Sequence, residues 1–122
     1  VEFHSFIPKK DLDNVLLNCH VTVLASKCYE TASMVVVESV QLGLLPITCN
    51  HGGMKEMIGL CNLGFTFNSN DAKGLSLRML EAYESYEESY RDLISNREKI
   101  VNQFGQDIFY NSLMGLYSDL LR

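Results

Sequence analysis

Features that mark several common protein classes are missing from this sequence of 122 residues. No run of apolar residues is long enough to span a bilayer. The net charge is −5 and the basic residues are scattered, which argues against nucleic acid as the main partner, because a phosphate backbone requires a clustered basic face. Neither a G-x-G-x-x-G sequence nor a Walker loop occurs, so a generic nucleotide-binding domain of another chemistry is disfavoured.

The four cysteines, Cys19, Cys28, Cys49 and Cys61, show no C-x-x-C spacing and have apolar neighbours. This pattern favours reduced thiols in the core of a cytoplasmic protein over a disulfide pair or a zinc site. We therefore expect no bound metal.

The apolar content of 47% is enough for a single hydrophobic core. Strands are predicted at residues 1–7, 20–26, 47–49 and 64–67, and helical segments at 9–19, 33–42 and within 51–59. This alternation predicts a Rossmann-like α/β domain, in which a parallel sheet carries helices on both faces. After residue 70 only helices are expected, starting at an Asp71 cap. Residues 1–122 thus form one predicted domain, with an alternating core at 1–70 and C-terminal helices at 71–122.

Residues 29–40 read YETASMVVVESV, where Glu30 and Glu38 bracket a nearly apolar run. The β-branched valines favour a strand. A strand covered on both faces, however, has no place for the charge of Glu38, and Gly43 is well placed as a helix stop. We therefore predict a buried helix from Ser33 to Leu42.

This helix would present three groups to one crevice at the end of the preceding strand. Glu30 would lie in the loop, Glu38 in the second helical turn, and the amides of residues 32–35 at the helix N-terminus, which favours phosphate. Amide donors and two carboxylate acceptors suit a nucleotide sugar. The alternative stays open that Glu30 is a surface acid and that Glu38 pairs with a lysine.

The ordered motifs of the chain resemble the donor-binding, C-terminal domain of GT-B glycosyltransferases, in particular the retaining family 4. The matching stretches are V-x-F (Val1, Phe3), I-P (Ile7, Pro8), HVTVLAS ending at Ser26, E-x7-E (Glu30, Glu38), GLLPIT, G-G-x-x-E (Gly52, Gly53, Glu56) and G-F-x-F (64–67). The set covers nearly the whole chain. It implies a partial GT-B C-terminal domain with a helical tail.

The resemblance also implies roles for individual residues. Glu30, as the catalytic residue, would contact hydroxyls of the donor sugar, and Glu38 would accept hydrogen bonds from the ribose. The amides around Ala32, Ser33 and Met34 would lie against the sugar and diphosphate. Gly52 and Gly53 would form a tight turn near the donor, with Glu56 capping or bracing it. No metal or cofactor is implied besides the nucleotide-sugar donor.

Several positions depart from the family pattern. Ala32 and Ser33 stand where Phe-Gly is usual, and Ser5 replaces a common glycine. The basic pair that neutralises the diphosphate and the acceptor domain would both precede Val1. The chain is therefore expected to be the C-terminal portion of a larger glycosyltransferase, inactive alone, with its own N-terminal acceptor domain as a partner.

The expected function is retaining sugar transfer from a nucleotide sugar in polysaccharide or glycoconjugate synthesis. The protein is expected in the cytoplasm. A second expected location is the cytoplasmic face of a membrane, with which the full-length protein would associate peripherally. A non-catalytic GT-B-like binding or assembly module is the alternative. For His51, the role of a turn residue is favoured over that of a proton donor. For Tyr83, Tyr86 and Tyr90, packing against the core is favoured over a surface for sugar stacking or for a partner. The amphipathic segment 108–121 would pack on other sequence or, left exposed, favour a dimer.

Overall fold

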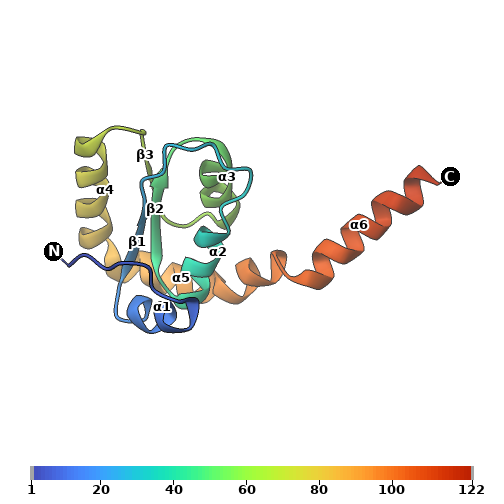
Figure 1. The fold of residues 1–122 in the computed structure, drawn as a ribbon, viewed down its shortest axis with the longest axis horizontal. Coiled ribbons are helices and arrows are strands. Elements are labelled where there is room, and N and C mark those ends of the chain that lie inside the picture. The colour runs from blue at the N-terminus through green and yellow to red at the C-terminus, as the bar shows by residue number, and fades with distance from the viewer. Residues whose placement is uncertain (1, 122) are drawn as a thin grey trace.

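Three parallel strands form the centre of the fold (Figure 1). The computed structural model describes residues 2–121, in which β1 (Val21–Leu24), β2 (Leu45–Cys49) and β3 (Phe65–Phe67) lie in that order. Val21 pairs with Leu45. The middle strand, β2, is buried along its whole length. The predicted parallel sheet is confirmed.

Helices cover both faces of this sheet, with α4 on one side and α2 and α3 on the other (Figure 1). The helices are α1 (Lys9–Leu16), α2 (Met34–Leu42), α3 (Gly52–Cys61), α4 (Ala72–Glu84), α5 (Tyr86–Gln103) and α6 (Gln106–Leu120). Asp71 caps α4 by accepting a 2.8 Å hydrogen bond from the Gly74 amide, as predicted. The Rossmann-like α/β architecture with a helical C-terminal end is therefore confirmed.

The valine-rich segment is helical because its apolar positions recur on one face. Val36 and Val40 of α2 are fully buried, and Gly43 ends the helix in a left-handed conformation at φ 80°. The buried Ser39 hydroxyl accepts a 2.8 Å hydrogen bond from the Thr22 hydroxyl of β1. Packing on the sheet thus outweighs the strand propensity of the valines.

The strand predicted at residues 1–7 is wrong for the part that the structure describes. Residues 2–8 form no strand, and the side chains of Phe3 and Phe6 are at least 90% exposed. An extended segment becomes a strand only when a neighbouring strand satisfies its backbone groups, and no strand of the sheet pairs with these residues. Val1 lies outside the described residues.

β1 is also less covered than its sequence predicts. The Val23 side chain is 42% exposed, whereas a strand enclosed on both faces was expected. The cause is position, because β1 is an edge of the described three-stranded sheet.

The cysteines divide into two groups. All four are free thiols, as expected. Cys49 and Cys61 are buried, but Cys19 and Cys28 are exposed, so the predicted core position is wrong for these two. Cys19 lies beyond the end of α1 and Cys28 in the loop after β1, where no second layer covers them.

Candidate functional site

Two loops meet where parallel strands end. The loop from β1 to α2 carries Glu30, and the loop from β2 leads directly into α3 at Gly52 and Gly53. The Gly53 amide donates a 2.6 Å hydrogen bond to the Glu30 carbonyl oxygen. The start of α3 therefore holds the backbone of the Glu30 loop in place.

A side chain is sterically disfavoured at both of these positions. Gly52 has φ 54°, and a Cβ atom there would lie 3.0 Å from the Glu30 carbonyl oxygen. A Cβ atom on Gly53 would lie 2.4 Å from the Thr31 carbonyl oxygen, closer than any relaxed contact allows. The glycine pair thus permits a backbone approach that a side chain would block.

A ring contact joins the same loops beside this approach. The rings of Tyr29 and His51 lie 4.8 Å apart between centroids, at an interplanar angle of 42°. His51 Nε2 lies 3.2 Å from the Cys28 carbonyl oxygen, and since a carbonyl only accepts, Nε2 donates. Residues 28–30 are thus bound to residues 51–53 through both backbone and side chains.

The N-terminus of α2 follows directly after Glu30. Glu30 is half-buried, Ala32 and Met34 are exposed, and Ser33 is buried at the N-cap. The Ser33 hydroxyl makes no hydrogen bond to any described residue, although an N-cap serine commonly bonds to the first helical turn. The Val36 amide donates to the Ser33 carbonyl oxygen, whereas the amides of Met34 and Val35 have no backbone partner among the described residues and can bind an anion.

Glu38 is engaged elsewhere. Its Oε1 atom lies 2.7 Å from Nζ of Lys9, the first residue of α1. The side chain of Lys9 is 72% exposed and that of Glu38 is 46% exposed. The hydrogen bond to Glu38, and then its negative charge, raise the pKa of Lys9. The pair lines a cavity of about 390 Å³ between α1, β1 and α2, and Glu30 is not part of that lining. The lysine pairing that the sequence left open is therefore present.

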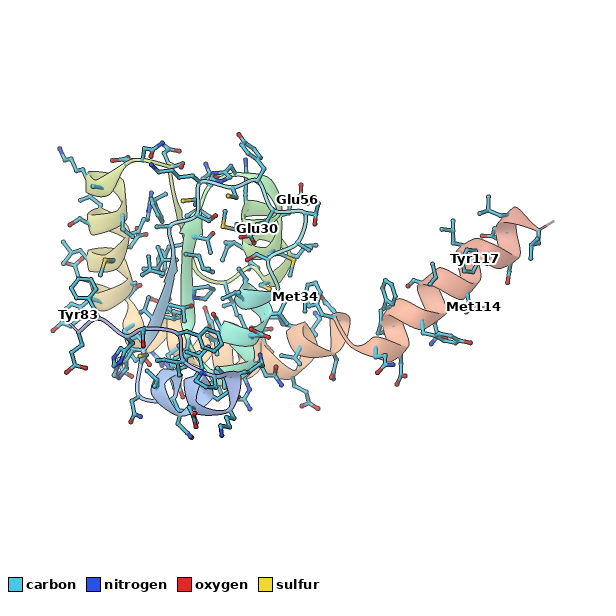
Figure 2. The ribbon with its side chains drawn as sticks, in the orientation of Figure 1. Glu30, Met34, Glu56, Tyr83, Met114 and Tyr117 are labelled. Atoms are coloured by element: carbon cyan, nitrogen blue, oxygen red, sulfur yellow. The ribbon has the colours of Figure 1, made fainter. Side chains whose placement is uncertain are left out.

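Glu56 projects from the second turn of α3. Its side chain is exposed, and within residues 2–121 no hydrogen bond or ion pair to it is formed. Figure 2 shows Glu30 and Glu56 on the side of the sheet opposite Tyr83. The structure therefore brings Glu30, Gly52, Gly53 and Glu56 to one region and ties Glu38 to α1.

For one of these contacts the sequence left the partner of Glu38 unspecified, and the other contact was missed. Lys9 lies 29 residues before Glu38, and no local pattern marks the pair. The contact between Tyr29 and His51 had a partial signal, since each adjoins a motif residue that the resemblance had already singled out. Within residues 2–121, no helix has both the length and the apolar character needed to cross a membrane. The same residues contain no group of three metal-ligating side chains.

Comparison with known proteins identifies the family that this arrangement belongs to. The family model of the glycosyl transferases group 1 matches residues 1–100, which include all three strands and the two fastened loops. A search of curated protein sequences gave no significant match. The three parallel strands with covering helices agree with part of a GT-B domain. Because the model matches well over half of the sequence, the chain belongs to the group 1 glycosyltransferases.

Proposed function

We propose that this chain is the donor-binding part of a glycosyltransferase that transfers a sugar from a nucleotide sugar with retention of configuration. The observation that carries the proposal is the hydrogen bond from the Gly53 amide to the Glu30 carbonyl oxygen. It holds the Glu30 loop in place directly before the N-terminus of α2. Amide donors for a diphosphate and a carboxylate for sugar hydroxyls are adjacent there. The family of the chain supplies the reaction type.

In this proposal each residue has a separate role. The amides of residues 32–34 bind the diphosphate, with α2 favouring its negative charge. Glu30 accepts hydrogen bonds from sugar hydroxyls, and Gly52 and Gly53 keep its loop in position. Glu38 accepts from the ribose hydroxyls, which requires Lys9 to release it. Glu56 braces the α3 side of the pocket.

The wider setting belongs to the same proposal. The donor-binding part works with an acceptor-binding domain of the same protein, in polysaccharide or glycoconjugate synthesis. The reaction takes place in the cytoplasm, including at the cytoplasmic face of a membrane. In this proposal helix amides, rather than a metal ion, take the polar contacts with the diphosphate.

Isothermal titration calorimetry with UDP, GDP and ADP tests the proposal. We expect one nucleoside diphosphate to bind. Glu38→Ala should weaken the affinity for this nucleotide about tenfold, which is the effect of losing a hydrogen bond to a charged group. Glu84→Ala is the matched control, because this glutamate lies at the end of α4 and is exposed. The proposal fails if no nucleotide binds, or if Glu38→Ala and Glu84→Ala behave alike.

A second function, a non-catalytic binding or assembly module, is favoured by one observation. Ser33 occupies the place of a family glycine, and its buried hydroxyl has no partner among the described residues. A serine there restricts the approach of a ligand to the backbone. Sugar turnover by the full-length protein decides the matter: turnover excludes the module, and nucleotide binding without turnover supports it.

A further inference from the structure

Two exposed tyrosines of similar accessibility differ in how they are held. Tyr29 is 82% exposed and Tyr83 is 81% exposed. The ring of Tyr29 lies against His51, whereas Tyr83 makes no ring contact with any described residue. The Tyr29 ring is therefore presented to solvent in a restrained position.

His51 is itself fixed, so the restraint is not a chance contact of two mobile rings. Its Nε2 atom donates to the Cys28 carbonyl oxygen at 3.2 Å, directly before Tyr29 in the chain. The next residue, Glu30, is held through its carbonyl oxygen by the Gly53 amide. Tyr29 thus stands between two anchored peptide groups.

We propose that Tyr29 is a specificity residue whose ring contacts the sugar ring of the donor and that His51 is the residue that positions it. This inference rests on the proposed function and names the part of the ligand that Tyr29 reads. A pyranose has an apolar face of C–H groups and a rim of hydroxyls. The exposed Tyr29 ring matches the apolar face, and the carboxylate of the next residue, Glu30, matches the hydroxyls.

The geometry gives the two residues distinct parts. The imidazole packs against the Tyr29 ring at a tilt of 42°, and a sugar stacks on the part of this ring that is exposed. His51 contacts no sugar in this arrangement and acts through Tyr29 and the Cys28 carbonyl. The nucleoside diphosphate lies at the amides of α2 and does not depend on the Tyr29 ring.

The experiment compares paired ligands by calorimetry. Each of UDP, GDP and ADP is titrated beside UDP-glucose, UDP-N-acetylglucosamine, GDP-mannose and ADP-glucose. We expect Tyr29→Ala to weaken binding of the preferred nucleotide sugar about tenfold, with binding of its nucleoside diphosphate unchanged within about twofold. Tyr29→Phe keeps the ring and should keep the affinity. Tyr83→Ala is the matched control and should change neither.

His51 is tested through a double-mutant cycle. His51→Ala should weaken sugar-dependent binding less than Tyr29→Ala does, and combining the two should add little, since His51 acts through Tyr29. His51→Phe keeps a ring beside Tyr29 and should recover part of the loss. Circular dichroism should show that each variant is folded.

The outcomes separate this inference from the proposed function. If a nucleoside diphosphate binds but Tyr29→Ala leaves the affinity for the nucleotide sugar unchanged, the role of Tyr29 is overturned and the proposed function stands. Equal losses for both ligands would also overturn it, because they mean general damage to the loop. If no nucleotide binds the unsubstituted protein, both fail together.

Discussion

The amide of Gly53 donates to the carbonyl oxygen of Glu30 across 2.6 Å, and this bond joins the loops after two neighbouring strands. The contact depends on the absence of a side chain at residue 53. The position of the candidate sugar-binding carboxylate is thereby set by the first turn of α3, whose register is fixed in turn by buried Met54 and Met57.

Gly53→Ala should destabilise the protein by roughly 2–3 kcal/mol, because its Cβ atom would overlap the Thr31 carbonyl and force the loop away. Urea unfolding followed by circular dichroism measures this change. Gly59→Ala is the matched control in the same helix, since no atom lies within 4 Å of its added Cβ. That control should be neutral or stabilising by up to about 1 kcal/mol. Equal effects at both positions would contradict the proposed packing of the Glu30 loop.

Ser33→Ala should stabilise the protein by about 1 kcal/mol, because it removes a buried hydroxyl that has no hydrogen-bond partner among the described residues. Ser39→Ala provides the contrast, since the Ser39 hydroxyl bonds to Thr22 and to the Val35 carbonyl. Its removal leaves a polar partner unsatisfied and should destabilise the protein by about 1–2 kcal/mol. Melting temperatures of the two variants should therefore move in opposite directions, and a loss in both would contradict this account.

The sequence predicted α2 correctly and the first strand wrongly, because local signals determine a helix but do not determine whether a strand has a partner. The alternation of strands, the stop at Gly43 and the charge of Glu38 were all local signals, and the structure agrees with them. Residues 2–7 carry an equally clear alternation, yet a strand requires a neighbour, and periodicity contains no information about which partner is present. The pairing of Lys9 with Glu38 was hidden for the same reason, since it joins α1 to α2 across 29 residues.

The ion pair of Lys9 and Glu38 should be visible in the titration of Lys9. The hydrogen bond to Glu38 raises the pKa of Lys9 above 10.5, so the contribution of the pair to stability is present below that pH. It is lost as the pH rises through the raised pKa. Glu38→Gln should move the midpoint of the Lys9 ε-methylene signal in NMR to lower pH. A midpoint unaffected by Glu38→Gln would show that the pair is not formed in solution.

The four thiols should react at two different rates. Burial raises the pKa of Cys49 and of Cys61 and also limits access of a reagent, whereas Cys19 and Cys28 are exposed. Because the thiolate is the nucleophile, N-ethylmaleimide near neutral pH should label Cys19 and Cys28 first. Mass spectrometry of peptides after timed labelling measures the order, and labelling in urea should make all four equal. Rapid labelling of Cys61 in the folded protein would contradict the observed packing of α3.

The last helix should mediate association of two copies of the chain. No residue of α6 is buried, and Figure 1 shows the helix extending from the body. Apart from partly buried Leu113, its large apolar side chains, and Leu121 beside them, are 42–88% exposed: Ile108, Phe109, Tyr110, Met114, Leu116, Tyr117, Leu120 and Leu121. The helix has two aspartates and no basic residue, so a second copy suits this face better than an anionic membrane.

The unsubstituted chain is expected to sediment as a dimer at about 50 µM. Phe109→Glu combined with Leu116→Glu places two charges on this apolar face, one heptad apart, and should leave the chain monomeric at that concentration. Asn111→Glu with Ser118→Glu adds the same charge at the same spacing on the polar side of α6. This control should remain dimeric, because burial of a charge, rather than net charge, opposes the association. A monomeric unsubstituted chain at that concentration would exclude the second copy as the partner of α6, and dissociation of both double variants would point to repulsion between whole molecules.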